Sequence, residues 1–213
     1  MQKTRQKLKK VLDAIRSSIK KETSGVAIPF IAFGAALNLS LGQLVGLIKL
    51  PLYLDSIGTV LVAILCGPWA AIIAGSVANI VSSIMFSPPS VFFIPTVAVI
   101  GAFTGLWAKR GFFRRWYTAV AGGVLQGILA AVVSAPISAY LFSGVTLSGM
   151  DFLVIYFRHV GKTILESTFL QGLASDPVDK ALTYLVAFLV VQRLPYRLVI
   201  RFPRHENILR ASE

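Results

Sequence analysis

The stretch 56-SIGTVLVAILCGPWAAIIAGSVANIVSSIMF-86 decides how the chain is threaded. It is too long for one membrane span of about 20 residues and too short for two full ones. Because glycine can end a helix and proline can start one, Gly67-Pro68 predicts a break inside it. We therefore expect a short second span at about 55–66 and a third span at about 68–85.

The composition is that of an integral membrane protein. Of the 213 residues, 55% are hydrophobic and 14% are charged, and the mean hydropathy is +0.74. Soluble domains have roughly 45–50% apolar and 25% charged residues. A net charge of +12 could indicate nucleic-acid binding, but the basic residues cluster at the termini and in loops. They are expected to orient the protein in the membrane, with no nucleic acid as a partner.

The hydrophobic pattern predicts an all-α fold, a six-helix transmembrane bundle. Residues 1–25 are expected to form a basic amphipathic helix on the cytoplasmic surface, in contact with membrane lipid. The membrane domain covers 26–194, and 195–213 form a basic cytoplasmic tail. The last span is expected to open on Asp176 as a helix cap followed by Pro177. The six spans are expected at about 26–47, 55–66, 68–85, 94–108, 117–142 and 177–194.

The segment 151-DFLVIYFRHVGKTILESTFLQGLASD-176 is long enough to cross a membrane but carries many charges. On one continuous helix, Asp151, Arg158, Lys162 and Glu166 would project onto a single face. That pattern favours an extra external or re-entrant helix before the last span.

The distribution of basic residues supports this layout. With both termini inside, most of the 21 Lys and Arg residues face the cytoplasm. Only Lys49, Arg158, Lys162 and Lys180 fall outside. If Gly67-Pro68 were a kink within one span, the basic cluster at 109–115 would also lie outside. We therefore expect a multi-pass protein of the cell membrane with both termini cytoplasmic.

Motifs for catalysis are weak. Gly161-Lys162-Thr163 resembles the end of a phosphate-binding loop, but Tyr156 stands where its first glycine is required. With two histidines and a single cysteine, a metal site of the usual ligands is not expected. The pair Asp176 and Asp179 is the one candidate for a membrane-embedded transferase. We expect no catalytic residue, no metal and no cofactor.

The outer loop 49-KLPLYLDSIGT-59 interrupts the hydrophobic pattern with polar residues. Asp55 could cap the next helix, contact a solute, or do both. Tyr53 could be an interfacial belt residue or a platform for a bound ring. The amides of Asn38, Gln43 and Asn79 need partners inside a membrane, which could be neighbouring helices or a solute.

Pairs of small residues at four-residue spacing recur in the spans. They allow helices to approach closely, either within the bundle or against another protein. The pairs are Ala32-x-x-x-Ala36, Gly101-x-x-x-Gly105 and Gly123-x-x-x-Gly127.

Taken in order, the small-residue first span, the loop 49-KLPLYLDSIGT-59 and the turn 65-LCGPWAAIIAG-75 resemble the substrate-binding S components of energy-coupling factor (ECF) vitamin transporters. The resemblance implies a helical bundle that binds a vitamin or cofactor precursor near its outer face and performs no chemistry. It implies as partners a transmembrane coupling subunit and two ATPases. Ala32 and Ala36 would dock on the coupling subunit, and the loop 49–55 would gate the pocket.

On this basis we expect a set of substrate-binding side chains from the first spans, the outer loop and the charged segment. A membrane scaffold or sensor and a small membrane-embedded transferase are the alternatives. The expected substrate-binding residues are Asn38, Gln43, Tyr53, Asp55, Asn79, Arg158, His159, Lys162 and Glu166.

Overall fold

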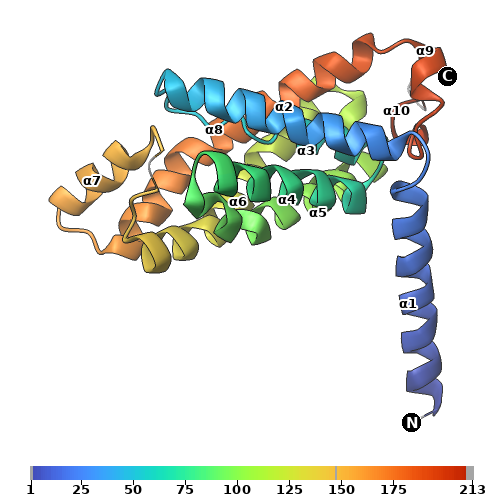
Figure 1. Ribbon diagram of the computed structural model, residues 1–213, viewed down its shortest axis with the longest axis horizontal. Coiled ribbons are helices and arrows are strands. Elements are labelled where there is room, and N and C mark those ends of the chain that lie inside the picture. The colour runs from blue at the N-terminus through green and yellow to red at the C-terminus, as the bar shows by residue number, and fades with distance from the viewer. Residues whose placement is uncertain (1, 147, 210–213) are drawn as a thin grey trace.

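The computed structural model describes residues 2–146 and 148–209, in which every regular element is a helix (Figure 1). The last four residues of the predicted basic tail lie outside the described part. The elements are α1 (Gln2–Glu22), α2 (Ala27–Leu47), α3 (Ile57–Leu65), α4 (Pro68–Met85), η1 (Pro88–Phe93), α5 (Ile94–Lys109), η2 (Phe112–Arg114), α6 (Trp116–Phe142), α7 (Asp151–His159), α8 (Ile164–Arg193), α9 (Tyr196–Val199) and α10 (Glu206–Leu209).

Four helical segments are long and apolar enough to cross a membrane, which confirms an all-α membrane protein. Helix α3 has nine residues, or about 14 Å, roughly half of a bilayer core. Helix α8 has 30 residues but carries internal charges. The four segments are Ala27–Leu47, Pro68–Met85, Pro88–Lys109 and Trp116–Phe142.

The predicted break at Gly67-Pro68 is confirmed. Helix α3 ends at Leu65, and α4 begins with Pro68 in its first turn. Gly67 has φ +117°, a conformation that disfavours residues with a side chain. A methyl group there would also collide with the carboxylate of Glu22. The glycine is therefore required by both the backbone and its neighbour.

The prediction that Asp176 and Pro177 open the last helix is wrong. Helix α8 runs unbroken through Pro177 and starts from a capping box at Thr163. The Thr163 amide donates to Glu166 Oε2 at 2.9 Å, and the Glu166 amide donates to Thr163 Oγ1 at 3.3 Å. Bonds from Thr163 lower the pKa of the Glu166 carboxyl. Packing against α6 carries the helix through Pro177, as neighbouring helices do for prolines in membranes.

The predicted common face of the charged segment is also wrong. Helix α7 ends at His159, and Gly161, with φ +89°, turns the chain before α8 begins. Asp151 instead binds the preceding loop, accepting hydrogen bonds from the hydroxyls of Thr146 at 3.1 Å and Ser148 at 2.9 Å. Because the helix is interrupted, charges on either side of the turn do not line up.

Both glycine pairs are used inside the bundle. Added methyl groups at Gly101 and Gly105 would collide with α4, and those at Gly123 and Gly127 would collide with the backbone of α8. The helices α6 and α8 form the most extensive contact in the bundle. Internal packing is thus the role of these two pairs.

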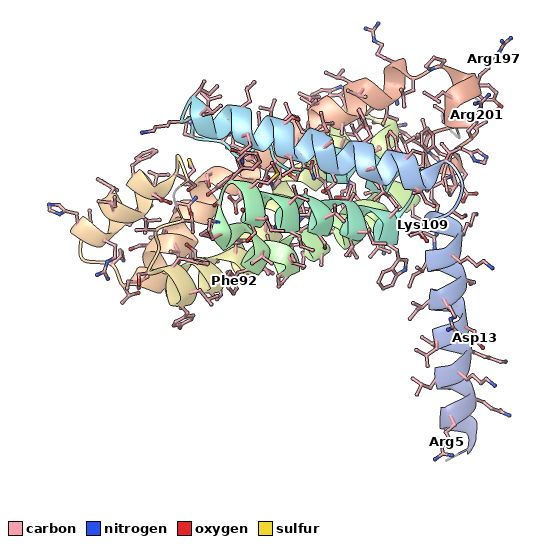
Figure 2. The ribbon with its side chains drawn as sticks, in the orientation of Figure 1. Arg5, Asp13, Phe92, Lys109, Arg197 and Arg201 are labelled. Carbon is pink, nitrogen blue, oxygen red and sulfur yellow. The ribbon has the colours of Figure 1, made fainter. Side chains whose placement is uncertain are left out.

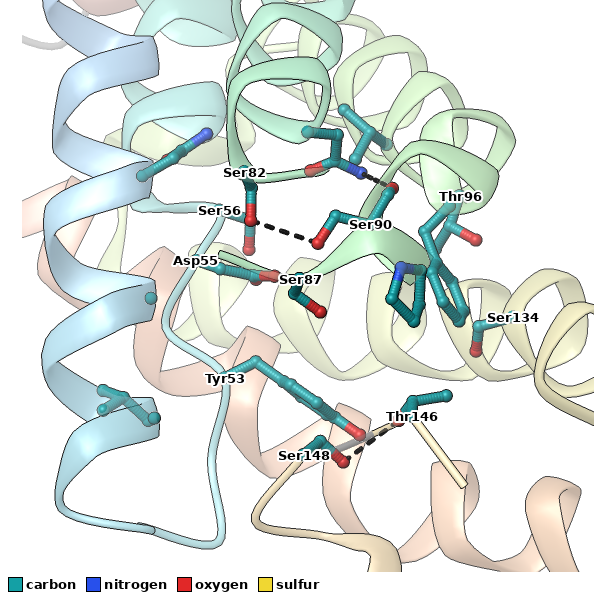
Figure 3. A pocket seen from close by; sticks show the side chains of 18 of the residues that line it. Tyr53, Asp55, Ser56, Ser82, Ser87, Ser90, Thr96, Ser134, Thr146 and Ser148 are labelled. Atoms are coloured by element: carbon teal, nitrogen blue, oxygen red, sulfur yellow. Dashed lines mark hydrogen bonds between the residues drawn. The ribbon is translucent and has the colours of Figure 1, made fainter. Parts of the chain in front are cut away.

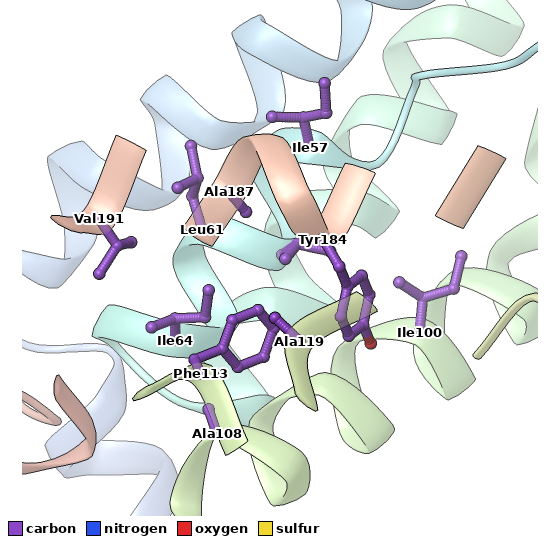
Figure 4. Packing of buried hydrophobic residues seen from close by; sticks show 11 residues of the cluster. Ile57, Leu61, Ile64, Ile100, Ala108, Phe113, Ala119, Tyr184, Ala187 and Val191 are labelled. Atoms are coloured by element: carbon purple, nitrogen blue, oxygen red, sulfur yellow. The ribbon is translucent and has the colours of Figure 1, made fainter. Parts of the chain in front are cut away.

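An apolar core fills the space between α3, α5, α6 and α8 (Figure 4). Tyr184 is completely buried there, with its ring 5.2 Å from that of Phe113. Its hydroxyl lies 2.6 Å from Thr104 Oγ1, so the one polar atom of this side chain has a partner.

A buried ion pair joins both termini to one end of the bundle. Glu22, fully buried, accepts from Arg204 Nη2 at 2.6 Å and from the Trp69 amide at 2.8 Å. Helix α1 leaves this point and projects away from the bundle (Figure 1). Its exposed apolar side chains include Leu8 and Leu12, so the helix is amphipathic as predicted, while its contact with lipid stays a prediction.

The basic clusters gather at the same end of the bundle. Lys109, Arg197 and Arg201 lie there, near the base of α1 (Figure 2). Lys180 does not belong to the outer surface, as the charge count assumed, because it is buried in the middle of α8. The side of the membrane on which this end lies stays a prediction.

We predict that Gly127→Ala destabilises the bundle, because its methyl group would meet the backbone of Asp176 and Pro177. Overpacking of this kind costs about 1–3 kcal/mol, so the Tm of the purified protein should fall by several degrees. Gly46→Ala is the matched control, since nothing lies within 4 Å of the position. Equal Tm values for the two variants would contradict the assigned packing.

Candidate functional site

A cavity of about 490 Å³ lies between α2, α4, α5, α6 and α8. The loop at 48–56, the residues Thr146, Ser148 and Gly149, and the 3-10 helix η1 partly cover it. Hydroxyl groups from several elements face it, and Tyr53 and Asp55 project into it from the first loop (Figure 3). Its volume lies within the roughly 300–1,000 Å³ of small-molecule sites.

The loop at 48–56 is anchored in the bundle by Asp179. This fully buried residue of α8 accepts the backbone amides of Tyr53 at 2.9 Å and Leu54 at 2.8 Å through Oδ1. Leu54 has φ +48°, which is uncommon for a residue with a branched side chain. The loop therefore descends to the level of Asp179 and is held there by its backbone.

Lys180 completes this anchor. Its ammonium group donates to Asp179 Oδ2 at 2.6 Å and to Ser56 Oγ at 2.8 Å, and it lies 3.5 Å from Asp55 Oδ1. Lys180 is 4% exposed, whereas the Asp55 side chain is 52% exposed. A buried cation needs such partners, because its desolvation is costly.

Asp55 does not cap α3, so that alternative is wrong. Ser56 precedes the helix, and its side chain makes no capping bond. The amides of Gly58 at 2.7 Å and Thr59 at 3.3 Å donate instead to Asn38 Oδ1, which reaches across from α2. Because Asn38 serves the start of α3, Asp55 is left to face the cavity and Lys180.

Five expected substrate-binding residues come together around the cavity. Asn38 and Gln43 line it from α2, Tyr53 and Asp55 from the loop, and Asn79 from α4. The Asn79 amide group also donates to the Ser90 carbonyl at 3.0 Å, which positions η1. Asn38 and Asn79 thus make contacts within the protein and still face the cavity.

The other four expected residues do not line this cavity. Arg158 and His159 lie at the end of α7, and Lys162 and Glu166 lie at the turn into α8. All four are exposed. The expectation that they face the solute with Tyr53 and Asp55 is corrected, because α7 ends before it could carry them inward.

Four lining residues of α8, Thr168 among them, were not expected to bind the solute. Gln171, Asp176 and Lys180 face the cavity from this helix. The pattern that could have revealed them is charge inside an apolar segment, with Asp176 and Lys180 one helical turn apart. The prediction that a helix starts at residue 177 separated Asp176 from Lys180, so this pattern was not recognised.

Tyr53 lines the cavity and takes part in a hydrogen bond there. Gln171 Nε2 donates to Tyr53 Oη at 3.2 Å. Burial, followed by the negative charge of Asp176, raises the pKa of the Tyr53 phenol. The phenol therefore stays protonated at neutral pH.

The arrangement is suited to binding a polar solute. Both carboxylate oxygens of Asp179 are taken by the loop and Lys180, and Asp179 does not line the cavity. It therefore does not form an acid pair with Asp176 across the site. In the described part of the chain, no group of three His, Cys, Asp or Glu side chains is arranged to hold a metal.

Comparison of the chain with models of protein families, with curated proteins and with solved structures finds no match. The class of protein is therefore defined here by the fold and the cavity alone. The protein is a helical membrane protein with a cavity that is lined by both polar and apolar side chains and partly covered by loops.

We predict that the buried pair is strongly coupled. Asp179→Ala leaves Lys180 buried without its closest partner, and Lys180→Met leaves Asp179 without a cation. Each should lower the free energy of unfolding by about 3–5 kcal/mol, and the double variant by clearly less than their sum. Unfolding of the purified protein in detergent measures this, with the exposed Lys162→Met as control. Additive losses would contradict the coupling.

Proposed function

We propose that this chain is the substrate-binding S component of an ECF-type importer, capturing a vitamin-like small molecule. The observation that carries the proposal is the cavity of about 490 Å³ beneath the loop at 48–56. Its walls combine hydroxyls, amides and aromatic rings, as expected of a site that binds a polar ring compound. A loop tied at one point and closing over the cavity can exclude water and strengthen each polar contact.

The arrangement of the helices supports a six-segment layout. The segments α2, α3, α4, α5, α6 and α8 alternate in direction along the bundle (Figure 1). The basic clusters lie at the end opposite the loop at 48–56. If that end is cytoplasmic, as the positive-inside rule requires, both termini are inside and the cavity opens outward at the cell membrane.

Helix α2 supports docking on a coupling subunit. Ala32 and Ala36 are exposed on its outer face, while Gly34, Ala35 and Asn38 on its other face are buried. Small exposed side chains in a membrane helix allow another helix to approach closely. A coupling subunit with two ATPases would then supply the energy, and the bundle would topple within the membrane to release the solute inside.

The direct test is mass spectrometry of small molecules released from the purified protein. We expect one species at close to stoichiometric amount, because a solute held by several polar contacts beneath the loop at 48–56 would dissociate slowly. Asn79→Leu should lose this species, because the substitution replaces a polar side chain of the cavity lining with an apolar one. Lys162→Met, outside the cavity, should keep it. Absence of any retained molecule, together with no uptake in cells, would contradict the proposal.

The docking face is tested with tryptophan substitutions. Ala32→Trp and Ala36→Trp should reduce co-purification of a co-expressed ECF coupling subunit at least tenfold, because a bulky side chain prevents close approach. The retained solute should be unchanged. Ala121→Trp, at an exposed alanine of α6, is the matched control. Equal co-purification by all three variants would reject this face as the docking site.

A further inference from the structure

We propose that the solute bound in this cavity is a cation, an ammonium or a protonated ring nitrogen, held by the carboxylate of Asp176. This inference rests on the proposed function and narrows its substrate class. It depends on the charges around the cavity and on which of them already have partners.

Asp176 is a buried carboxylate facing the cavity without an ionic partner. It is 6% exposed and lines the cavity from α8. Its Oδ1 accepts a hydrogen bond from Ser175 Oγ at 3.1 Å. The ion pairs described in this region join Lys180 to Asp179 and to Asp55, and neither includes Asp176. A cation bound in the cavity would stabilise the ionised form of this buried carboxyl group.

Lys180 makes its hydrogen bonds with Asp179 and Ser56 and none with Asp176. Its ammonium group also forms an ion pair with Asp55 at 3.5 Å. Of the described residues that line the cavity, Lys180 is the only basic one. A carboxylate or phosphate solute would therefore face Asp55 and Asp176, and the one ammonium group of the described lining is already bonded to Asp179 and Ser56.

The balance of charge points the same way. Asp55 and Asp176 line the cavity with Lys180, and the ammonium group of Lys180 is also paired with Asp179, which does not line it. Asp55 is half exposed, so water can solvate it. Asp176 is buried, and a cationic solute would take the place of the water that its carboxylate loses on burial.

A second, independent feature indicates a polar ligand opposite. Thr96 lines the cavity from α5 and is 8% exposed, yet its Oγ1 has no hydrogen-bond partner (Figure 3). Buried hydroxyls in native proteins are nearly always paired. The rings of Tyr53 and Phe93 also face the cavity and can stabilise a cation over their faces. The solute thus joins a cationic nitrogen to a second polar group.

The test uses three indole probes of similar shape and different charge: tryptamine, the neutral tryptophol and the anionic indole-3-acetate. Binding to the purified full chain is measured by calorimetry. We expect tryptamine to bind at least tenfold more tightly than tryptophol, and indole-3-acetate not to bind. Asp176→Asn should abolish the preference, whereas Asp176→Glu, which keeps the charge, and Asp13→Asn, at an exposed acid of α1, should retain it.

The solute released from the native protein provides the second readout. Electrophoresis at pH 7 should carry it toward the cathode, and Asp176→Asn should retain at least tenfold less of it. A retained neutral or anionic solute, equal retention by Asp176→Asn, or a tryptamine preference that survives in Asp176→Asn would overturn this inference and leave the proposed function standing. If no probe binds and no solute is retained, both proposals fail.

Discussion

The structure depends on one buried contact, in which Asp179 and Lys180 of α8 hold the loop at 48–56. Asp179 takes two backbone amides of the loop, and Lys180 links Asp179 to Ser56 and Asp55. Two adjacent charges of opposite sign inside a membrane protein stabilise each other only when both are fully hydrogen-bonded. Here Asp179 accepts from the two loop amides and from Lys180, and Lys180 also donates to Ser56, so the bonds that stabilise the pair are the bonds that position the loop.

The depth of this anchor also explains the cavity. Because the loop is drawn down to Asp179, α3 begins in the middle of the bundle and needs only nine residues to reach the opposite end. The space that a full-length helix would fill is left open beside α2, α4 and α8. Close packing elsewhere, through Gly34 against Gly58 and Gly127 against Pro177, keeps the remaining helices compact around it.

Much of the helix pattern was accessible from the sequence, because apolar runs and the Gly67-Pro68 break are local signals. The course of the chain after 150 was not. The Asp176-Pro177 pair has the local features of a helix start, and only the contact with α6 shows that the helix continues. The candidate site divides similarly: Asn38, Tyr53 and Asp55 were found because they interrupt apolar runs near the loop. The partnership of Lys180 with a loop more than a hundred residues away depends on the tertiary fold.

The anchor of the loop has a consequence for how such a site can diversify. Asp179 grips the main chain at Tyr53 and Leu54, and every amino acid except proline offers the same amide there. Backbone atoms of these residues therefore attach the loop to the bundle, and their side chains are free to determine which molecule is bound. Side chains on the loop can change to suit another molecule while the loop remains fastened in the same place, so one scaffold can acquire new ligands through few substitutions.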